Sequence, residues 1–538
     1  MNDRGNEYVP VLVVGGSLVG LSASVFLGRL GIPHRVVERH AATSAHPRGR
    51  GNNMRTMELF RTAGLEPDIR KAATTLSKNH GILQVDTLRG ESRRWLSARI
   101  TGRPPEMDLC STVRCACSQN DLEPVLLQGA RDLGGDVRFG TELLSFSQDA
   151  DGVRSVLQAR DTGETYTVRS DYLFAADGPR SPVRERLGIE HSGSGDLFHN
   201  VSVTFRSKLL REVAGEQKFV VCYVTDPVGE GVLLPVDNEE QWVFHVPWFP
   251  ERGQTLEHFT ESRITEHIRA AAGVRDLDVE ITGKAPWHAA DRVANSYRDG
   301  RVFLMGDSAH EMPPTGAFGS NTGIQDAHNL AWKIAAVLRG WAGSTLLDSY
   351  EAERRPVAQT TSARATVQAA REQHPGYSAR TASNDSADLM TVALGYRYAS
   401  GAVVGATAQE VIPDVLCLDG EPGSRAPHLW VTRDGAQVST IDLYERSFVL
   451  LCGGPDWRTA ARTVGARLNV PLDVYSVGDG AEYDLDTGGG ANWPSAHGVA
   501  PEGAVLVRPD GFVAWRAEAE TADREKELTG VLLRILGR

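Results

Sequence analysis

Several features that mark particular classes of protein are missing from this chain of 538 residues. No apolar run reaches the length of a membrane-spanning helix, and the polar start MNDRGNEYVP has no signal-peptide character. The formal net charge of −12, with no basic stripe, argues against a surface for nucleic acid. We therefore expect a cytoplasmic protein that binds neither membrane nor nucleic acid. Its length predicts two to four domains.

Cysteine is scarce, with six residues in the whole chain. Cys115 and Cys117 have CxC spacing, but no second pair of cysteines or histidines completes a zinc set. The absence of CxxC disfavours disulfide exchange. We expect reduced thiols and no bound metal.

The first positive signal is a strand, a glycine-rich turn and a helix near the N-terminus. Residues 11–14 form an aliphatic run typical of a buried parallel strand, and GGSLVG and a helix over 21–30 follow. A helix start of this kind offers free N–H groups to a pyrophosphate. Glu38, 23 residues after Gly15 and at the end of a second strand, has the spacing of a ribose ligand. The pattern predicts dinucleotide binding, although Ser17 replaces the second glycine of GxGxxG.

A second signal lies far along the chain, in RVFLMGDSAHEMPPTGAFGSNTGIQDAHNLAWK at residues 301–333. A strand predicted over 301–305 ends at Gly306 and Asp307, where a carboxylate can accept hydrogen bonds from ribityl hydroxyls. Gly316 and Gly319 allow the backbone to approach a flat ring. A helix predicted over 321–338 directs its positive N-terminus at that loop. Together the two signals predict an FAD site assembled from both ends of one domain.

The predicted fold class is α/β, with an α+β mixture of three domains. Alternating strands and helices predict a Rossmann-like FAD-binding domain over 1–190 and 291–400, including helices over 54–63 and 118–132 and a strand over 172–176. Alternating apolar and polar residues predict an antiparallel-sheet substrate domain over 191–290. Residues 405–538 predict a further α/β unit. Its strands are expected in APHLWVT, STIDLY and FVLLCGG, with a helix in WRTAARTVGARL and a hairpin around Pro509-Asp510-Gly511.

These motifs resemble those of the flavoprotein aromatic hydroxylases, the single-component group related to p-hydroxybenzoate hydroxylase. The family's Asp-Gly motif matches Asp177-Gly178, its GD motif matches Gly306-Asp307, and DSYEAERRP at 348–356 is a further family pattern. The resemblance is strongest to the polyketide hydroxylase branch of antibiotic pathways, which carries a thioredoxin-like C-terminal domain. One departure is GAFGSN at 316–321, where the family often has GGxGMN.

The resemblance implies a set of residues that contact FAD or hold the loops around it. They are Gly15, Ser17, Leu18 and Gly20 at the pyrophosphate, Glu38 at the ribose, Arg39 and Leu143 near the adenine, Arg48 and Gln119 beside the flavin and ribityl chain, Asp177 between the loops, Gly306 and Asp307 at ribityl or pyrophosphate groups, and Pro314, Gly319, Ser320, Asn321 and Thr322 along the isoalloxazine.

The implied reaction is a hydroxylation of a large planar aromatic substrate by a monomer or homodimer. NADPH, or NADH, reduces FAD, and O₂ then forms a flavin C4a-hydroperoxide that transfers one oxygen. No catalytic base stands out: His310, Arg48 and Pro314 are weak candidates, and His245, His288 and Tyr223 are equally open. Baeyer–Villiger insertion, a flavin-dependent reductase without oxygen transfer, and a binding protein with a degenerate site are the alternatives.

Overall fold

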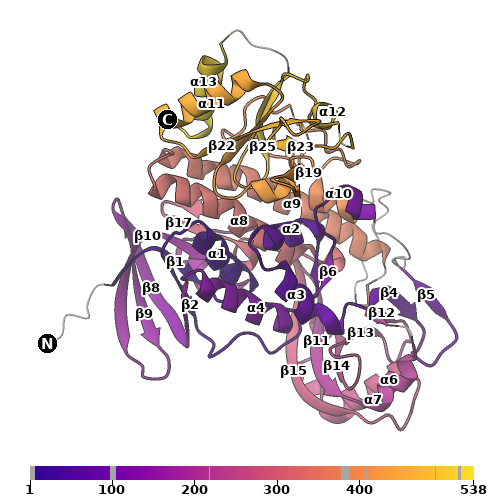
Figure 1. Cartoon of the computed structure of the whole chain (residues 1–538). Helices are drawn as coiled ribbons and strands as arrows, with labels where there is room; N and C mark the ends of the chain where they lie inside the picture. Colours follow the sequence, from indigo (N-terminus) through magenta and orange to yellow (C-terminus); the bar gives the residue numbers. More distant parts are fainter. Residues whose placement is uncertain are drawn as a thin grey trace.

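The computed structural model describes residues 7–96, 105–216, 218–372, 374–376, 388–407, 410–490, 492–518 and 523–538. Two large sheets occupy the part of the chain up to residue 311, and a third lies in the C-terminal unit (Figure 1). None of the helices in these ranges is long and apolar enough to cross a membrane.

The first sheet has a parallel centre, as the N-terminal pattern predicts. Its order is β16-β17-β10-β1-β2-β7, and β8 and β9 extend from β10 as an antiparallel hairpin. Parallel pairing joins β1 to β2 and β10, β2 to β7, and β10 to β17. The strands are β1 (Glu7–Val14), β2 (His34–Glu38), β7 (Asp136–Phe139), β8 (Thr141–Asp149), β9 (Gly152–Ala159), β10 (Thr165–Ala175), β16 (Arg298–Asp299) and β17 (Val302–Leu304).

Helix α1 (Leu18–Arg29) contacts both α4 (Gln119–Asp132) and α8 (Phe318–Leu338) beside this sheet. Helices α1 and α8 each begin three residues earlier than predicted. Gly20 and Gly319 lie in their first turns and lower the local helix propensity, but tertiary packing overrides that preference. The other elements of this half are α2 (Met54–Thr62), α3 (Glu66–Ala72), α5 (Pro182–Arg186), α9 (Asp348–Arg371), α10 (Leu389–Leu394) and the paired short strands β3 (Gly51–Asn52) and β6 (Cys115–Ala116).

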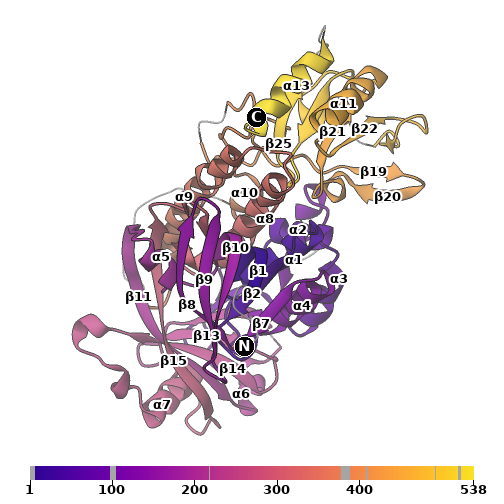
Figure 2. The same ribbon diagram turned by 90° about the vertical axis from the view of Figure 1, so that its left-hand side faces the viewer.

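The second sheet has the order β18-β15-β11-β14-β13-β12-β4-β5, and its centre is antiparallel as predicted. One face packs against α7 through Val203, Phe244, Ile264 and Ile268, whereas the other lies toward the first sheet and α9 (Figure 2). Its elements are β4 (His80–Val85), β5 (Arg93–Trp95), β11 (His191–Arg206), α6 (Leu209–Ala214), β12 (Phe219–Val224), β13 (Gly231–Pro235), β14 (Gln241–Trp248), α7 (Glu261–Ala272), β15 (Glu280–Ala294) and β18 (His310–Glu311).

The predicted limits of this second unit are wrong at two places. Strands β4 and β5, placed by the sequence in the FAD-binding domain, belong to the second sheet, where β4 pairs in parallel with β12. Strand β15 runs past 290 to Ala294 and pairs with β18, which follows the GD motif. Both errors arise because the pairing partners are distant in sequence, so local pattern carries no information about the sheet that a strand joins.

The C-terminal unit is the predicted α/β domain. Parallel β21 and β22 lie at the centre of the sheet β20-β19-β23-β22-β21-β24-β25, and α11 packs against α13. STIDLY is not a strand, because it closes β20 and continues as a 3₁₀ turn that Ser439 caps. The elements are β19 (Trp430–Arg433), β20 (Ala436–Ser439), β21 (Phe448–Cys452), α11 (Pro455–Leu468), β22 (Leu472–Gly478), β23 (Leu485–Asp486), α12 (Trp493–His497), β24 (Ala504–Val507), β25 (Val513–Ala517) and α13 (Arg524–Ile535).

Buried charges join this unit to the FAD-binding half. Arg508 and Asp510, in the turn between β24 and β25, meet Glu353 of α9 and Lys333 of α8, and all four side chains are almost fully buried. Glu353 accepts from Lys333 at 2.7 Å and from Arg508 at 2.6 Å. The pKa of Glu353 lies well below its ordinary range because both cations face it, and this attraction outweighs the effect of burial. The hairpin between β24 and β25 therefore completes a buried charge cluster. Removing any one of its side chains would leave a buried charge without its partner.

Candidate functional site

The glycine-rich turn after β1 requires glycine for steric reasons. Gly15 has φ +107°, and a Cβ at this position would lie 2.1 Å from the carbonyl oxygen of Ala176. A Cβ on Gly20 would lie 1.8 Å from the carbonyl oxygen of Gly15, and one on Gly16 would lie 2.7 Å from Cβ of Glu38. These contacts hold the ends of β1, β2 and β10 close to the start of α1, a close approach that glycine permits and a larger residue would not.

Glu38 lies beside this turn. Its carboxylate accepts hydrogen bonds from the backbone N–H groups of Gly16 at 2.7 Å and His40 at 2.9 Å. Arg39 next to it is exposed, and Leu143 is half-buried on the neighbouring β8. Glu38 ends β2, Arg39 follows it, and Leu143 lies on β8, which contacts β2, so the residues predicted around the adenosine lie on neighbouring strands.

The start of α1 is connected to the start of α4 through a buried carboxylate that the sequence prediction missed. Glu123, only 1% exposed, accepts hydrogen bonds from the Ser17 hydroxyl, from Gln119 Nε2 at 2.7 Å and from the Ser44 N–H at 2.7 Å. No side chain among the described residues caps α1 at Ser17, so the first N–H groups of the helix remain available to a ligand. In the sequence, Glu123 directly follows Leu122 within SQNDLEP. An ordinary amphipathic helix shows the same pattern, so the local sequence does not mark Glu123 as a residue of the site.

The two central motifs, Asp177-Gly178 and Gly306-Asp307, are linked by Arg184. Its guanidinium donates to the carbonyl oxygens of Ser308 and Pro179, both at 3.0 Å. Asp177 accepts from the Ser181 hydroxyl at 2.5 Å and from the Val183 N–H at 3.1 Å, and burial raises the pKa of its carboxyl. Asp177 therefore holds the loop after β10, and its predicted role near FAD stays a prediction.

Asp307 is free for a ligand. Gly306 turns the chain with φ +60° against Val19 of α1, where a Cβ would lie 2.8 Å from a Val19 methyl group. Part of the Asp307 side chain reaches solvent. The protein atoms around its carboxyl group still displace enough water to raise its pKa. No described residue donates a hydrogen bond to this carboxylate. A hydroxyl-bearing ligand chain would satisfy it.

The loop before α8 meets the segment that carries Arg48. Asn321 donates to the carbonyl oxygens of Gly51 at 2.8 Å and Ala317 at 2.6 Å, and it accepts from the Asn53 N–H at 3.0 Å. Gly316 and Ala317 both have positive φ, at 80° and 54°. The bend directs the N-terminus of α8, with Gly319, Ser320 and Thr322, toward residues 48–52. Arg48 and Pro314 are exposed on either side of this contact.

His310 is placed for support rather than for proton transfer at the open site. It is fully buried, and its Nε2 lies 2.9 Å from Oδ2 of Asp326. Asp326 also accepts from the Gly306 N–H at 3.1 Å and from Arg354 Nε at 2.8 Å. Asp326 and Arg354, which the sequence prediction did not single out, therefore hold the GD turn through His310 and Gly306.

The other base candidates lie on the second sheet. Burial lowers the pKa of His245 to about 3, and burial with Glu372 raises the pKa of Tyr223 well above 10. The Tyr223 hydroxyl donates to Glu372 at 3.4 Å. His288 lies on the opposite face, where a hydrogen bond to Glu311 raises its pKa. Both His245 and Tyr223 lie on the face toward the FAD motifs. Near neutral pH, both side chains are therefore uncharged.

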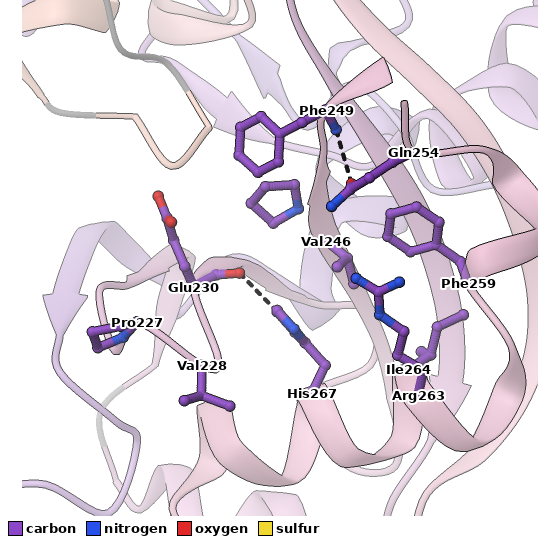
Figure 3. Close-up of a pocket in the computed structure, with 11 residues that line it drawn as sticks. Pro227, Val228, Glu230, Val246, Phe249, Gln254, Phe259, Arg263, Ile264 and His267 are labelled. Carbon is purple, nitrogen blue, oxygen red and sulfur yellow. Dashed lines mark hydrogen bonds between the residues drawn. The ribbon is translucent and has the colours of Figure 1, made fainter. Parts of the chain in front are cut away.

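A separate pocket of about 200 Å³ lies between the end of β14 and α7 (Figure 3). His267 bonds the carbonyl oxygen of Glu230 at 2.8 Å, and Gln254 accepts from the Phe249 N–H at 3.1 Å. None of the predicted site residues lines it.

The fold and the site define a class: a flavoprotein with a dinucleotide-binding half, a sheet domain over the flavin loop, and a C-terminal α/β unit. Over residues 8–365 the chain matches the family described as FAD binding domain, and over 419–538 it matches the aromatic-ring hydroxylase C-terminal family. The chain belongs to the FAD-dependent aromatic-ring hydroxylases, and is a monooxygenase of that family.

Named relatives are similar over nearly their whole length. A putative polyketide hydroxylase of Streptomyces halstedii is 61% identical over 529 residues, which cover 97% of this chain and 95% of the relative. Tetracenomycin A2 monooxygenase-dioxygenase of Streptomyces glaucescens is 42% identical, with coverage of 99% and 97%. The crystal structure of aklavinone-11 hydroxylase with FAD and aklavinone superposes with a TM-score of 0.90 at 37% identity, and both chains are covered completely.

Proposed function

We propose that this enzyme hydroxylates a polycyclic aromatic, polyketide-derived compound in antibiotic biosynthesis, with NADPH or NADH and O₂ as co-substrates. The observation that carries the proposal is the aromatic face of the second sheet, where Trp287 stacks on His245 with ring centroids 5.2 Å apart. This face meets the segment that leads to Arg48, where the Ser202 hydroxyl lies 3.3 Å from Nε2 of His46. The relatives named for polyketide, tetracenomycin and aklavinone chemistry support the same substrate class.

The predicted FAD residues fit the cofactor by their geometry. The cradle around Gly15 and Gly20 has no room for a Cβ, and the uncapped start of α1 suits a pyrophosphate. Glu38 would hold the ribose, Asp307 the ribityl hydroxyls, and the N-terminus of α8 the pyrimidine edge of the flavin. Bound FAD supplies the redox chemistry, accepting a hydride from the nicotinamide and activating O₂.

The protein's part is to bind, orient and exclude water. Trp287 and Phe198 would hold the ring system flat. His245 would stay neutral beside them, since its pKa of about 3 makes it too weak a base to hold the phenol proton. We assign no catalytic base and place the reaction in the cytoplasm, where reduced nicotinamide is available. The prediction that the enzyme is a monomer or a homodimer is untested by the structure of a single chain.

The proposal predicts that a bound substrate accelerates NADPH oxidation by the FAD-loaded enzyme. A screen of polycyclic phenols would follow nicotinamide absorbance, with mass spectrometry and NMR of each product. A product with one added oxygen on an intact ring supports the proposal. A ring-expanded product would identify Baeyer–Villiger chemistry instead, and equal oxidation rates with and without every compound would contradict a substrate-gated hydroxylase.

Replacing Asp307 by alanine should weaken FAD binding by about 10- to 100-fold, the scale of one lost charge-assisted hydrogen bond. Equilibrium dialysis followed by flavin fluorescence measures the change. Asp299→Ala is the matched control, because this exposed carboxylate lies on β16 of the same sheet. An Asp307→Ala protein that keeps the wild-type dissociation constant would refute the ribityl assignment.

A further inference from the structure

The second sheet contains a buried polar side chain that the site described above does not use. Asn200 lies in β11, opposite Trp287 of β15 and Pro247 of β14. It is fully buried, yet neither its Oδ1 nor its Nδ2 has a hydrogen-bond partner among the described residues. An amide left unpaired in the interior is destabilising, because it has given up its hydrogen bonds to water without replacing them. Stability alone does not explain an asparagine at this position.

Aromatic rings border this amide. Phe198, two residues earlier on the same face, lies 5.8 Å from Trp287 and 4.7 Å from His374 between ring centroids. His245 stacks on Trp287 with an interplanar angle of 28°. Burial lowers the pKa of His245 to about 3 and that of His374 to about 4, so both rings are uncharged near neutral pH. These surroundings suit a flat, uncharged ring system and disfavour a charged group.

The same face meets the FAD-binding half. The Ser202 hydroxyl, two residues after Asn200, lies 3.3 Å from Nε2 of His46, in the segment that leads to Arg48. On the other side, Gly376 follows α9, and a Cβ there would lie 3.7 Å from Oδ1 of Asn200. Asn200 therefore lies at the boundary between the sheet domain and the segments that frame the flavin loop.

We infer that Asn200 determines substrate specificity by binding two neighbouring oxygens on the edge of the planar substrate. Its Nδ2 donates to a carbonyl oxygen and its Oδ1 accepts from an adjacent phenolic hydroxyl. This rests on the proposed function, because it requires a polycyclic aromatic compound at this face. Asn200 selects and orients the ring system, and no bond to it forms or breaks. A site that hydrogen-bonds a substrate oxygen discriminates strongly against an analogue without it.

The test uses the full-length FAD-loaded protein and two probes, chrysazin (a dihydroxyanthraquinone) and unsubstituted anthraquinone. Binding is followed by perturbation of the flavin absorption spectrum. Wild type is expected to prefer chrysazin, and Asn200→Leu to bind chrysazin about tenfold or more weakly with unchanged affinity for anthraquinone. The melting temperature of Asn200→Leu should equal or exceed that of wild type, because the unpaired amide is gone. Thr204→Val, further along the same strand, is the control and should keep the wild-type preference.

The outcomes separate this inference from the function on which it rests. Equal chrysazin affinity in wild type and Asn200→Leu would overturn the inference and leave the proposed function standing. A lower melting temperature of Asn200→Leu with unchanged probe binding would assign the amide to a structural water and also overturn it. Binding of neither probe by the wild type would remove the proposed substrate class, and the inference with it.

Discussion

Replacing Glu353 by alanine is expected to destabilise the protein by about 3–5 kcal/mol, because two buried cations lose their shared carboxylate. Lys333 and Arg508 both contact Glu353, and neither side chain reaches solvent. Burial already lowers the pKa of Lys333 to about 8 with the carboxylate present. The loss should appear first as undocking of the C-terminal unit, since Arg508 is the residue of that unit that pairs with Glu353.

Urea denaturation followed by tryptophan fluorescence, with FAD saturating, measures this effect. The control is Asp348→Ala on the same helix, whose carboxylate is 70% exposed beside Arg298 and should contribute at most about 1 kcal/mol. The assignment fails if Glu353→Ala and Asp348→Ala unfold at the same urea concentration.

Acid should unfold this protein steeply, because several histidines are buried in the neutral form. Burial lowers the pKa values of His374, His428 and His497 to about 4, below the ordinary 6.5. As the pH falls below 6.5, the unfolded chain takes up these protons and the folded chain does not. These three histidines therefore do not change the stability above pH 6.5, and they reduce it progressively as the pH falls to about 4. The three groups together give a slope of at most about 4 kcal/mol per pH unit.

The measurement is the free energy of unfolding at a series of pH values between 7 and 4. His497→Phe is the informative variant, because His497 is fully buried in the C-terminal unit, away from the FAD motifs, with Nδ1 3.0 Å from the carbonyl oxygen of Trp493. This variant should reduce the slope of the free energy of unfolding against pH by the contribution of about one proton. A free energy that stays constant from pH 6.5 to pH 4.5 would show that these histidines do not control acid stability.

Local sequence predicted the parts of the site that are made within a few residues of each other. Gly15, Gly20 and Glu38 were predicted because a strand, a turn and a helix form a short continuous unit with steric requirements visible in the letters. Asp307 was predicted for the same reason, since it directly follows a buried strand. The assignment of these residues to FAD atoms stays a prediction.

Long-range polar partners were not predicted. Glu123 and Asp326 look like ordinary helical residues, and their roles appear only when Ser17, Gly306 and Arg354 meet them from distant segments. Strands β4 and β5 were misplaced for a related reason. HGILQV alternates only weakly, so nothing within it says that its partner begins at Phe219. When the tertiary fold brings hydrogen-bond partners together from distant segments, the local sequence of each segment does not identify the other partner.

The placement of β4 and β5 in the second sheet also sets the order of events during synthesis. On the ribosome, β4 has only β5 to pair with until Phe219 of β12 has emerged, and β10 lacks one parallel neighbour until Val302 follows. Neither large sheet can close as the chain grows, so unpaired strand edges persist through most of translation. Aggregation during expression should therefore depend more on the supply of chaperones that shield nascent strands than on the stability of the finished enzyme.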